Sequence, residues 1–266
     1  MKKVKSLTAC MLVVTMVWLL LIPSFAAKSQ YQRLIEYGYP KEYVDSLSDE
    51  MISQICNIIG NDTIIKVEKT EAILIETGDI NTCGAIPQSY MNFTGCAATI
   101  CKKGTNIITE VLVSVSWEWI GSKPTVRKQD AIAINWDSSV FNYVADSFYA
   151  QSFYKQSGTS NWRQFKEWTN LSEAVQGGVG FFTQLAYSSQ HVYNNKGEAA
   201  FVIQPNSPML KGSVYSSAIN YNYVHDRTPL VNGSIGFGIQ GASVSIKASS
   251  LTSDSTAATA NVFYSR

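Results

Sequence analysis

Residues 215–225 read YSSAINYNYVH, and this stretch indicates the fold class of the whole chain. Ile219, Tyr221 and Tyr223 share one parity, whereas the other parity carries mostly Ser, Ala and Asn. Because successive side chains of a β-strand point to opposite faces, this alternation predicts a strand with one aromatic face. A similar alternation returns in residues 258–264, so the C-terminal part of the chain predicts antiparallel β structure.

Between these two segments the alternation changes parity. Apolar residues occupy odd positions through Ile239 and even positions from Val244 onward. A slip of one residue moves apolar side chains to the other face unless the chain bulges or turns. The sequence therefore predicts a bulge or a tight turn at residues 240–243, near Gly241.

Residues 107–119 form the longest β-run of the chain. Five bulky side chains fall on one of its faces, which predicts a central strand; they are Val111, Val113, Val115, Trp117 and Trp119. Similar runs predict strands at residues 64–67, 72–77, 131–136, 143–155, 181–187 and 199–204, with a flexible break at residues 177–180 and a polar turn at residues 193–197. About ten to twelve strands without βαβ spacing indicate two packed sheets. The predicted fold class is mainly β, an antiparallel β-sandwich with a short N-terminal helical segment.

Helical patterns are confined to residues 29–60. Residues 30–37 can form two turns that end at Gly38, and a second helix is expected from the N-cap residue Ser48 to Gly60. The apolar residues of the second helix recur at three- and four-residue spacing, so one of its faces is expected to pack against the β-domain. We interpret the segment as a helical cap over an open end or edge of the sheet. A small recognition module and a pro-region that is removed later are the alternatives.

The first 26 residues have the three parts of a secretory signal. Lys2, Lys3 and Lys5 precede an apolar run, and Ser24 and Ala26 supply the small side chains that signal peptidase requires. We expect cleavage after Ala26 and a secreted, extracellular protein of bacterial type. The apolar run is shorter than the roughly 20 residues that span a bilayer, so no stable membrane span is expected in the mature chain.

Two further features concern the organisation of the chain. Residues 7–10 read LTAC, the pattern after which bacterial lipoproteins are cleaved and lipidated. Here the apolar run follows Cys10 instead of preceding it, so lipidation is the less favoured alternative. The expected domains are a signal peptide at residues 1–26, a helical cap at residues 27–61 and a β-sandwich domain at residues 62–266.

The charge of the chain argues against one class of partner. Without the three signal lysines, 18 basic residues remain against 20 acidic ones, which gives a net charge near −2. Proteins that bind nucleic acid or anionic membranes through bulk charge are basic. We therefore expect no nucleic-acid partner.

Four cysteines follow the signal: Cys56, Cys83, Cys96 and Cys101. In an oxidising exterior an even number predicts two disulfides, and three connectivities are open. A structural zinc site is the rival explanation, but these cysteines lack close paired spacing and the chain has only two histidines. We expect the disulfides to hold a long loop at residues 80–103, and we expect no metal and no cofactor.

No nucleophile elbow, zinc-protease motif, phosphate loop or acidic calcium loop occurs in the sequence. A carbohydrate-active hydrolase would use paired carboxylates, and Glu118 between two tryptophans is the most suggestive of them. Alternation places Glu118 on the face opposite both indoles, so we interpret it as a solvent-facing residue. We interpret His225 as a polar strand end that enters a turn, and His191 as a turn residue. The other acidic candidates are Asp130, Asp137, Asp146 and Glu167.

Trp162, Phe165 and Trp168 recur at three-residue spacing among charged residues, which predicts a helical turn or a bent aromatic edge strand. Aromatic rings stack on the apolar faces of sugars, and an exposed set of rings would form a binding platform. These three are therefore candidate binding residues for a polysaccharide, the cell wall or a surface protein. Aromatic residues in alternating segments also belong to cores, which is the other interpretation.

Pore-forming proteins are a third class. Residues 234–249 alternate between apolar and small polar side chains, as membrane-inserting hairpins do. A lipid-facing strand needs about ten alternating residues, and the parity change near Gly241 interrupts this one. Two shorter strands in a hairpin are still compatible with the class. A pore-forming protein would show an amphipathic hairpin packed against its body.

The Gly38-Tyr39-Pro40 turn and residues 46–55 resemble uncharacterised secreted proteins of Gram-positive bacteria. The resemblance covers the N-terminal third of the chain and implies location, without an activity or site residues. Together with the absence of a catalytic motif from the sequence, it favours a secreted, non-catalytic protein that binds carbohydrate, the cell wall or a protein ligand. A carbohydrate-active hydrolase and a β-pore-forming protein are the two alternatives.

Overall fold

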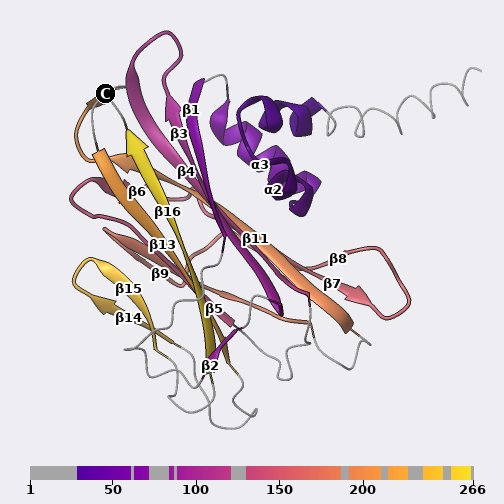
Figure 1. Ribbon diagram of the computed structural model, residues 1–266. Coiled ribbons are helices and arrows are strands. Elements are labelled where there is room, and N and C mark those ends of the chain that lie inside the picture. The colour runs from indigo at the N-terminus through magenta and orange to yellow at the C-terminus, as the bar shows by residue number, and fades with distance from the viewer. Residues whose placement is uncertain are drawn as a thin grey trace, which may run out of the picture.

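The computed structural model describes residues 29–60, 63–71, 84–86, 89–120, 130–186, 192–210, 215–226, 236–247 and 253–264. Two large sheets pack face to face, and a short helical segment precedes them (Figure 1). The predicted fold class, an antiparallel β-sandwich with an N-terminal helical segment, is confirmed. The expected signal peptide, Cys83 and His191 lie outside the described residues.

Sheet A has the strand order β1-β3-β4-β11-β7-β8, with β12 paired to β4 and β6 paired to β11. Its strands are β1 (Thr63–Glu71), β3 (Met91–Cys101), β4 (Ile107–Trp119), β6 (Phe141–Tyr143), β7 (Tyr149–Gln156), β8 (Arg163–Trp168), β11 (Val192–Pro205) and β12 (Met209–Leu210). Sheet B has the order β2-β16-β13-β5-β10-β9. Its strands are β2 (Gly84–Ala85), β5 (Asp130–Asn135), β9 (Glu173–Val175), β10 (Gly178–Thr183), β13 (Tyr215–Asp226) and β16 (Ser253–Tyr264). The hairpin of β14 (Gly236–Gln240) and β15 (Ser243–Lys247) belongs to neither sheet.

The inner faces of the two sheets form the main hydrophobic core. β4 lies between β3 and β11, which confirms the predicted central strand. All five side chains predicted for its core face are buried: Val111, Val113, Val115, Trp117 and Trp119. From sheet B, β13 contributes Ile219, Tyr221 and Tyr223 to the same core, as its aromatic face predicted. Side-chain alternation in two strands therefore brings the two sheets together.

One contact between the sheets depends on a glycine. The Tyr221 ring on β13 lies over Gly95 on β3, where an added Cβ would be 2.6 Å from two ring carbons. The Tyr221 hydroxyl donates to the Cys96 carbonyl oxygen at 3.1 Å. Burial raises the pKa of Tyr221 well above its ordinary value, so the hydroxyl keeps the proton that it donates.

Gly95→Ala is expected to lower the free energy of unfolding by about 1–3 kcal/mol, because the new methyl group overpacks the core against the Tyr221 ring. Urea-induced unfolding followed by tryptophan fluorescence measures this loss. Gly236→Ala is a matched control, since nothing lies within 4 Å of its added Cβ. Equal unfolding free energies for the wild type and Gly95→Ala would contradict the close contact.

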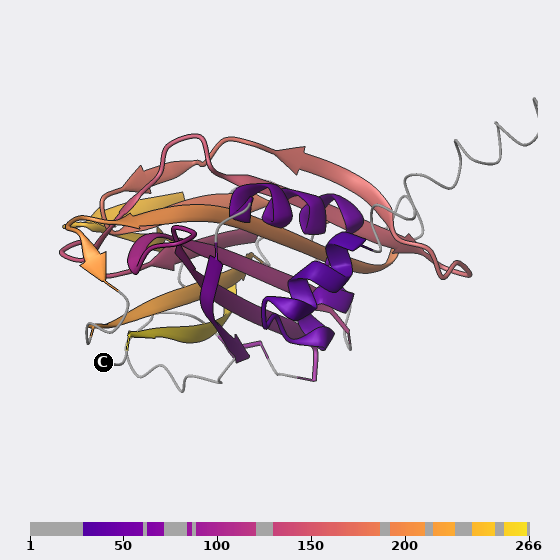
Figure 2. The same ribbon diagram turned by 90° about the horizontal axis from the view of Figure 1, so that it is seen from above.

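Helices cover the outer face of sheet A (Figures 1 and 2). Residues 29–36 are helical, and α2 (Lys41–Ser46) and α3 (Asp49–Ile59) follow. Their apolar side chains and the outward side chains of β3, β4 and β11 form a second core. The helical segment therefore lies on a face of the sheet, whereas the sequence suggested an end or an edge.

The predicted helix boundaries are confirmed. Gly38 and Gly60 follow their helices with φ values of +95° and +58°, which favour glycine. The Ser48 hydroxyl accepts a hydrogen bond from the Met51 N–H at 3.0 Å and so caps α3. Cap chemistry in the sequence thus sets both ends of α3.

A buried carboxylate fastens the helical layer to sheet A. Glu198 on β11 is 1% exposed and accepts hydrogen bonds from the Ser48 N–H at 2.9 Å and from the Ser48 hydroxyl. The Gln151 side chain on β7 donates to the same carboxylate. Because a helix N-terminus favours negative charge, Glu198 anchors the start of α3. Burial nevertheless raises the pKa of Glu198 above its ordinary value.

A raised carboxyl pKa makes a testable contribution to stability. The folded state retains a proton that the unfolded chain releases, so the contribution of Glu198 falls as the pH rises from about 4.5 through the folded-state pKa. The unfolding free energy of the wild type is therefore expected to decrease relative to that of Glu198→Gln over this window. Urea unfolding of both proteins from about pH 4 to about pH 8 measures the difference. A difference that is constant with pH would contradict the raised pKa.

The predicted polar turn at residues 193–197 is wrong. These residues lie within β11, which pairs with β4 on one side and β7 on the other. A Cβ at Gly197 would overlap with the Trp117 ring, so this glycine accommodates a core side chain. The expected flexible break at residues 177–180 is likewise wrong for residues 178–180, which begin β10. Pairing with neighbouring strands outweighs the local preference of Gly and Asn for turns.

The predicted disulfide-bearing loop also requires correction. Residues 91–101 form β3, and no disulfide joins Cys56, Cys96 and Cys101 to one another. Cys96 and Cys101 are five residues apart on one strand, which separates their Cα atoms by about 16 Å, whereas a disulfide needs less than about 7 Å. All three cysteines are buried, and the thiols of Cys56 and Cys101 donate to the carbonyl oxygens of Gln30 and Thr105. Cys83 lies outside the described residues, so pairings with it stay a prediction.

Candidate functional site

The β14–β15 hairpin has two faces of different character. Phe237 pairs with Ile246 and Ile239 pairs with Val244, so the four apolar side chains share one face. The opposite face carries small or polar residues throughout: Gly236, Gly238, Gln240, Ser243, Ser245 and Lys247. The hairpin is therefore amphipathic along its whole described length.

A tight turn connects the two strands. Gln240 pairs with Ser243, which leaves Gly241 and Ala242 as a two-residue turn. Gly241 has a φ of +60°, a backbone conformation typical of such hairpin turns. The tight turn predicted from the parity change is confirmed, and the change of parity is what places both apolar sets on one face.

The apolar face of the hairpin packs on the outer face of sheet B, opposite the helices (Figure 1). The Phe237 and Phe182 ring centroids are 4.7 Å apart. Ile246 packs on the same small cluster, whose buried members are Ala131 and Val224. Ile239 is 57% exposed, the largest exposed fraction of any large apolar side chain that the structure describes. The docked hairpin thus leaves part of its apolar face uncovered.

Among the described residues, three hydrogen bonds join the hairpin to sheet B and to its β9–β10 turn. The Asn135 side chain on β5 donates to the Val244 carbonyl oxygen at 3.0 Å and accepts from the Val244 N–H at 2.7 Å. At the turn, the Gly177 N–H donates to the Ala242 carbonyl oxygen at 2.8 Å. Neither strand of the hairpin joins the strand ladder of sheet B. Besides its apolar packing, the hairpin is therefore attached through one side chain and one loop in the described part of the chain.

Glycines on β10 allow the hairpin to approach this closely. A Cβ at Gly180 would lie 2.7 Å from a Phe237 ring carbon. A Cβ at Gly178 would overlap with the Asn135 side-chain oxygen and lie 3.0 Å from the Val244 nitrogen. A larger residue at either position would displace the hairpin or the Asn135 side chain.

The hairpin interrupts a two-stranded ribbon. β13 and β16 pair along their full length, from Tyr215 with Tyr264 to Asp226 with Ser253. β14 and β15 lie between them in the chain. The hairpin is thus an excursion from the end of this ribbon, folded back over sheet B.

The pairing register of the hairpin differs from that of the ribbon by an even number of residues. If the register of the β13–β16 ribbon were extended by number, Gly236 would be opposite Ser243. In the hairpin, Gly236 pairs with Lys247 instead, so the two registers differ by four residues. With an even offset, odd-numbered residues of the first strand pair with even-numbered residues of the second strand in both the ribbon and the hairpin. The parity of the buried Tyr223 in β13 is therefore the parity of the apolar Phe237 in β14.

The three candidate binding aromatics lie on or beside β8, a bent strand at the edge of sheet A. Each ring is half-buried, and their surroundings differ. Trp168 packs against the core between the sheets, and Phe165 lies at the bulge of β8. The ammonium nitrogens of Lys155 and Lys196 are 4.3 and 5.2 Å from the Trp162 ring centroid. A sugar would therefore compete with lysine side chains for the Trp162 ring.

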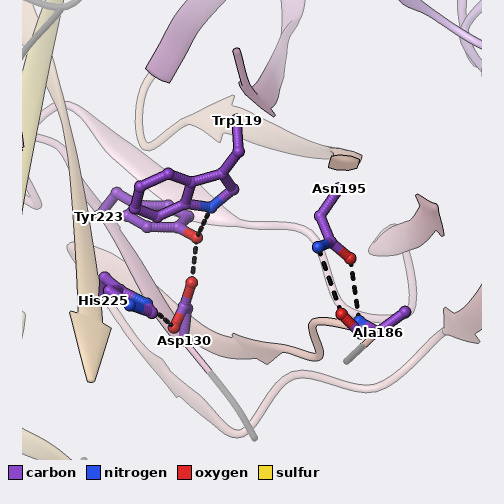
Figure 3. Close-up of polar contacts among 6 residues, drawn as sticks. All are labelled: Trp119, Asp130, Ala186, Asn195, Tyr223 and His225. Atoms are coloured by element: carbon purple, nitrogen blue, oxygen red, sulfur yellow. Dashed lines mark hydrogen bonds and ion pairs between the residues drawn. The ribbon is translucent and has the colours of Figure 1, made fainter. Parts of the chain in front are cut away.

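A buried polar network lies at the end of β13 from which the chain leaves for the hairpin (Figure 3). Asp130, 1% exposed, accepts a hydrogen bond from the Tyr223 hydroxyl, which accepts one from the Trp119 indole N–H at 3.2 Å. The other Asp130 oxygen is 2.8 Å from Nδ1 of His225. Burial and the charge of Asp130 raise the pKa of Tyr223 well above its ordinary value. His225 lies one residue before the end of β13, as its interpretation as a strand end expected, but it is 3% exposed and therefore belongs to the buried network. The turn expected after it lies outside the described residues.

Asp130→Ala is expected to lower the free energy of unfolding by about 3–5 kcal/mol, because it removes the buried carboxylate that Tyr223 and His225 share. The control is Asp137→Ala, whose carboxylate caps an exposed turn by accepting from the Ser139 N–H and hydroxyl and contributes about 1 kcal/mol or less. Urea unfolding compares the two. Equal losses would contradict a structural role for the buried pair.

The other acidic candidates lie on separate elements. Glu118 is on β4 and accepts from the Asn194 side chain at 3.2 Å, whereas Glu167 is on β8. Asp137 and Asp146 are in turns. Among the described residues, no group of three or more His, Cys, Asp or Glu side chains could hold a metal ion. None of the described helices has the length and apolarity to cross a membrane.

No protein-family model and no curated protein matches this chain. Among solved structures, the chain is similar to one titled a pore forming protein, with 9% identity, a TM-score of 0.36, and coverage of 77% of this chain and 97% of that chain. It is also similar to AvmM, which catalyses macrocyclization in alchivemycin A biosynthesis (14% identity, TM-score 0.24, coverage 69% and 97%). A third is the collagen binding domain of the Erysipelothrix rhusiopathiae surface protein RspB (8% identity, TM-score 0.24, coverage 64% and 66%). Likenesses of this size assign no function.

Sequence reasoning missed the residues that attach the hairpin. Asn135 is an ordinary polar residue at the end of a predicted strand, and its partner Val244 lies 109 positions away. The glycines at 178 and 180 were a visible signal, since glycine inside a strand often marks the close approach of another backbone. These glycines alternate with Val179, which is the pattern of a strand with no side chains on one of its faces. The prediction of a flexible break did not take this pattern into account.

Proposed function

We propose that this protein is exported and acts on membranes, where the β14–β15 hairpin leaves sheet B, inserts into the bilayer and forms a pore together with other copies. The observation that carries the proposal is the division of the hairpin into an apolar face and a small, polar face. An inserted strand pair needs this division, because one face meets lipid and the other meets water. The docked hairpin already has it.

The sequence around the hairpin is long enough to cross a bilayer. Odd positions from 231 to 239 read Val, Gly, Ile, Phe and Ile, and even positions from 244 to 252 read Val, Ile, Ala, Ser and Thr. Residues 231–240 keep an apolar residue or glycine at every odd position, whereas residues 243–252 alternate only as far as Ala248 and then carry Ser250, Leu251 and Thr252. Each segment has ten residues, and a tilted membrane strand needs about 9–11. The parity change near Gly241 separates two matched strands, so it does not count against insertion.

Insertion requires several copies of the chain. The outer N–H and C=O groups of a lone hairpin would lack partners in hydrocarbon, at a cost of several kcal/mol for each group. Hairpins of neighbouring chains satisfy these groups by pairing edge to edge.

Two substitutions at the tip of the hairpin test the proposal. Ile239→Asp places a charge on the apolar face, and Gln240→Asp places the same charge on the polar face. Both positions are exposed in the docked hairpin, so neither variant should unfold at a lower urea concentration. Release of a fluorescent dye from vesicles of phosphatidylcholine and phosphatidylglycerol is expected to fall at least about tenfold in Ile239→Asp and to stay within about twofold in Gln240→Asp.

The outcomes of this comparison are distinct. If the wild type releases dye and only Ile239→Asp abolishes the release, the result supports a lipid-facing position for Ile239. An absence of release by the wild type, over a range of lipid compositions, would contradict membrane insertion. Equal losses in both variants would mean that charge, and not its face, governs the effect.

A further inference from the structure

We infer that the Asn135 side chain is a latch that holds the hairpin in its docked position. The latch is a property of the folded protein, and only its consequence for membrane activity rests on the proposed function. Its carboxamide makes both hydrogen bonds between β5 and the backbone of Val244. Breaking this one side-chain contact is therefore expected to free the hairpin while leaving the sandwich folded.

Asn135 takes the place of a neighbouring strand. Along an antiparallel strand, alternate residues direct their N–H and C=O groups towards the partner strand and away from it. Ser243 belongs to the pair that flanks the turn, so the backbone groups of the next residue, Val244, point outward. One carboxamide donates to this C=O and accepts from this N–H, as the backbone of a pairing strand would.

The other attachments of the hairpin are few. The described apolar cluster beneath it has two buried members, Ala131 and Val224, and Val244 of the hairpin is itself buried against β10 at Gly180. Ile239 at its tip is largely exposed. The remaining polar attachment that the structure describes is the Gly177–Ala242 hydrogen bond at the turn. The two bonds of Asn135 are thus two of the three described hydrogen bonds that keep the hairpin docked.

Gly178 is the second component of the latch. The Asn135 side chain reaches Val244 across β10 at the position of Gly178, where a Cβ would overlap with the side-chain oxygen. Gly178→Ala is therefore expected to displace the carboxamide without removing it. Asn135→Ala and Gly178→Ala should release the hairpin by two different chemical changes.

Asn195 provides a matched control (Figure 3). Its carboxamide accepts from the Ala186 N–H at 2.9 Å and donates to the Ala186 carbonyl oxygen at 3.3 Å. Asn195 thus bonds to the N–H and C=O of a single residue, as Asn135 does with Val244. Asn195 lies on β11 and not under the hairpin. Asn195→Ala removes equivalent hydrogen bonds and leaves the hairpin attachments unchanged.

Amide hydrogen exchange of the full chain without lipid tests the latch directly. In Asn135→Ala and Gly178→Ala, amides of residues 236–247 are expected to exchange at least about tenfold faster than in the wild type, while those of β3 and β4 keep their protection. Asn195→Ala should not accelerate residues 236–247 selectively. Hairpin exchange that rises no more in the two latch variants than in Asn195→Ala would overturn the inference.

Dye release then separates the latch from the proposed function. If release occurs, it is expected to be several-fold faster in Asn135→Ala and Gly178→Ala than in the wild type and Asn195→Ala, which supports both the latch and insertion. Faster hairpin exchange with no dye release from any protein supports the latch and contradicts pore formation. Equal dye release by all four proteins, despite faster exchange in the latch variants, would show that undocking does not limit insertion. It would overturn the expected consequence of the latch for membrane activity.

Discussion

Both sheets of this protein carry apolar side chains on both faces, and this constraint accounts for the layers outside the sandwich. Packing the sheets together buries one face of each. The outward faces remain, with Leu112 and Val202 on sheet A and Phe182 and Val224 on sheet B. The helices cover the outward face of sheet A, and the β14–β15 hairpin covers the outward face of sheet B. A four-layer arrangement thus follows from strands that are apolar on both parities.

The two covers are attached with different strength. The helical layer has its own core of fully buried side chains, and the buried Glu198 binds the start of α3 to β11. The hairpin rests on a small apolar cluster and on the side chain of Asn135. Segments with few buried contacts open at lower free energy than the core does. Among the layers that the structure describes, the hairpin is therefore the one suited to leave the body.

Local patterns predicted most of the fold, whereas the site depends on distant pairs. The alternation of apolar and polar residues can be recognised within a few positions of the sequence. For this reason the central strand at residues 107–119 and the turn at Gly241 were predicted correctly. Asp130 and His225 are 95 positions apart, and each is unremarkable in its own segment. Asn135 likewise acquires its role only from the fold. Residues 193–197 have the composition of a turn, but strand partners on both sides make them part of β11.

In the proposed insertion, the apolar face of the hairpin moves from sheet B into lipid. The most direct measurement attaches an environment-sensitive fluorophore to single cysteines at positions 237–240, in a background whose native cysteines are replaced by alanine, and records its emission with and without vesicles. Insertion of the hairpin is expected to cause a blue shift of the emission at positions 237 and 239 and little change at positions 238 and 240. Alternate side chains of an inserted strand face lipid and water, so the shift should recur at every second residue. A shift that is absent, or equal at all four positions, would contradict insertion of this hairpin.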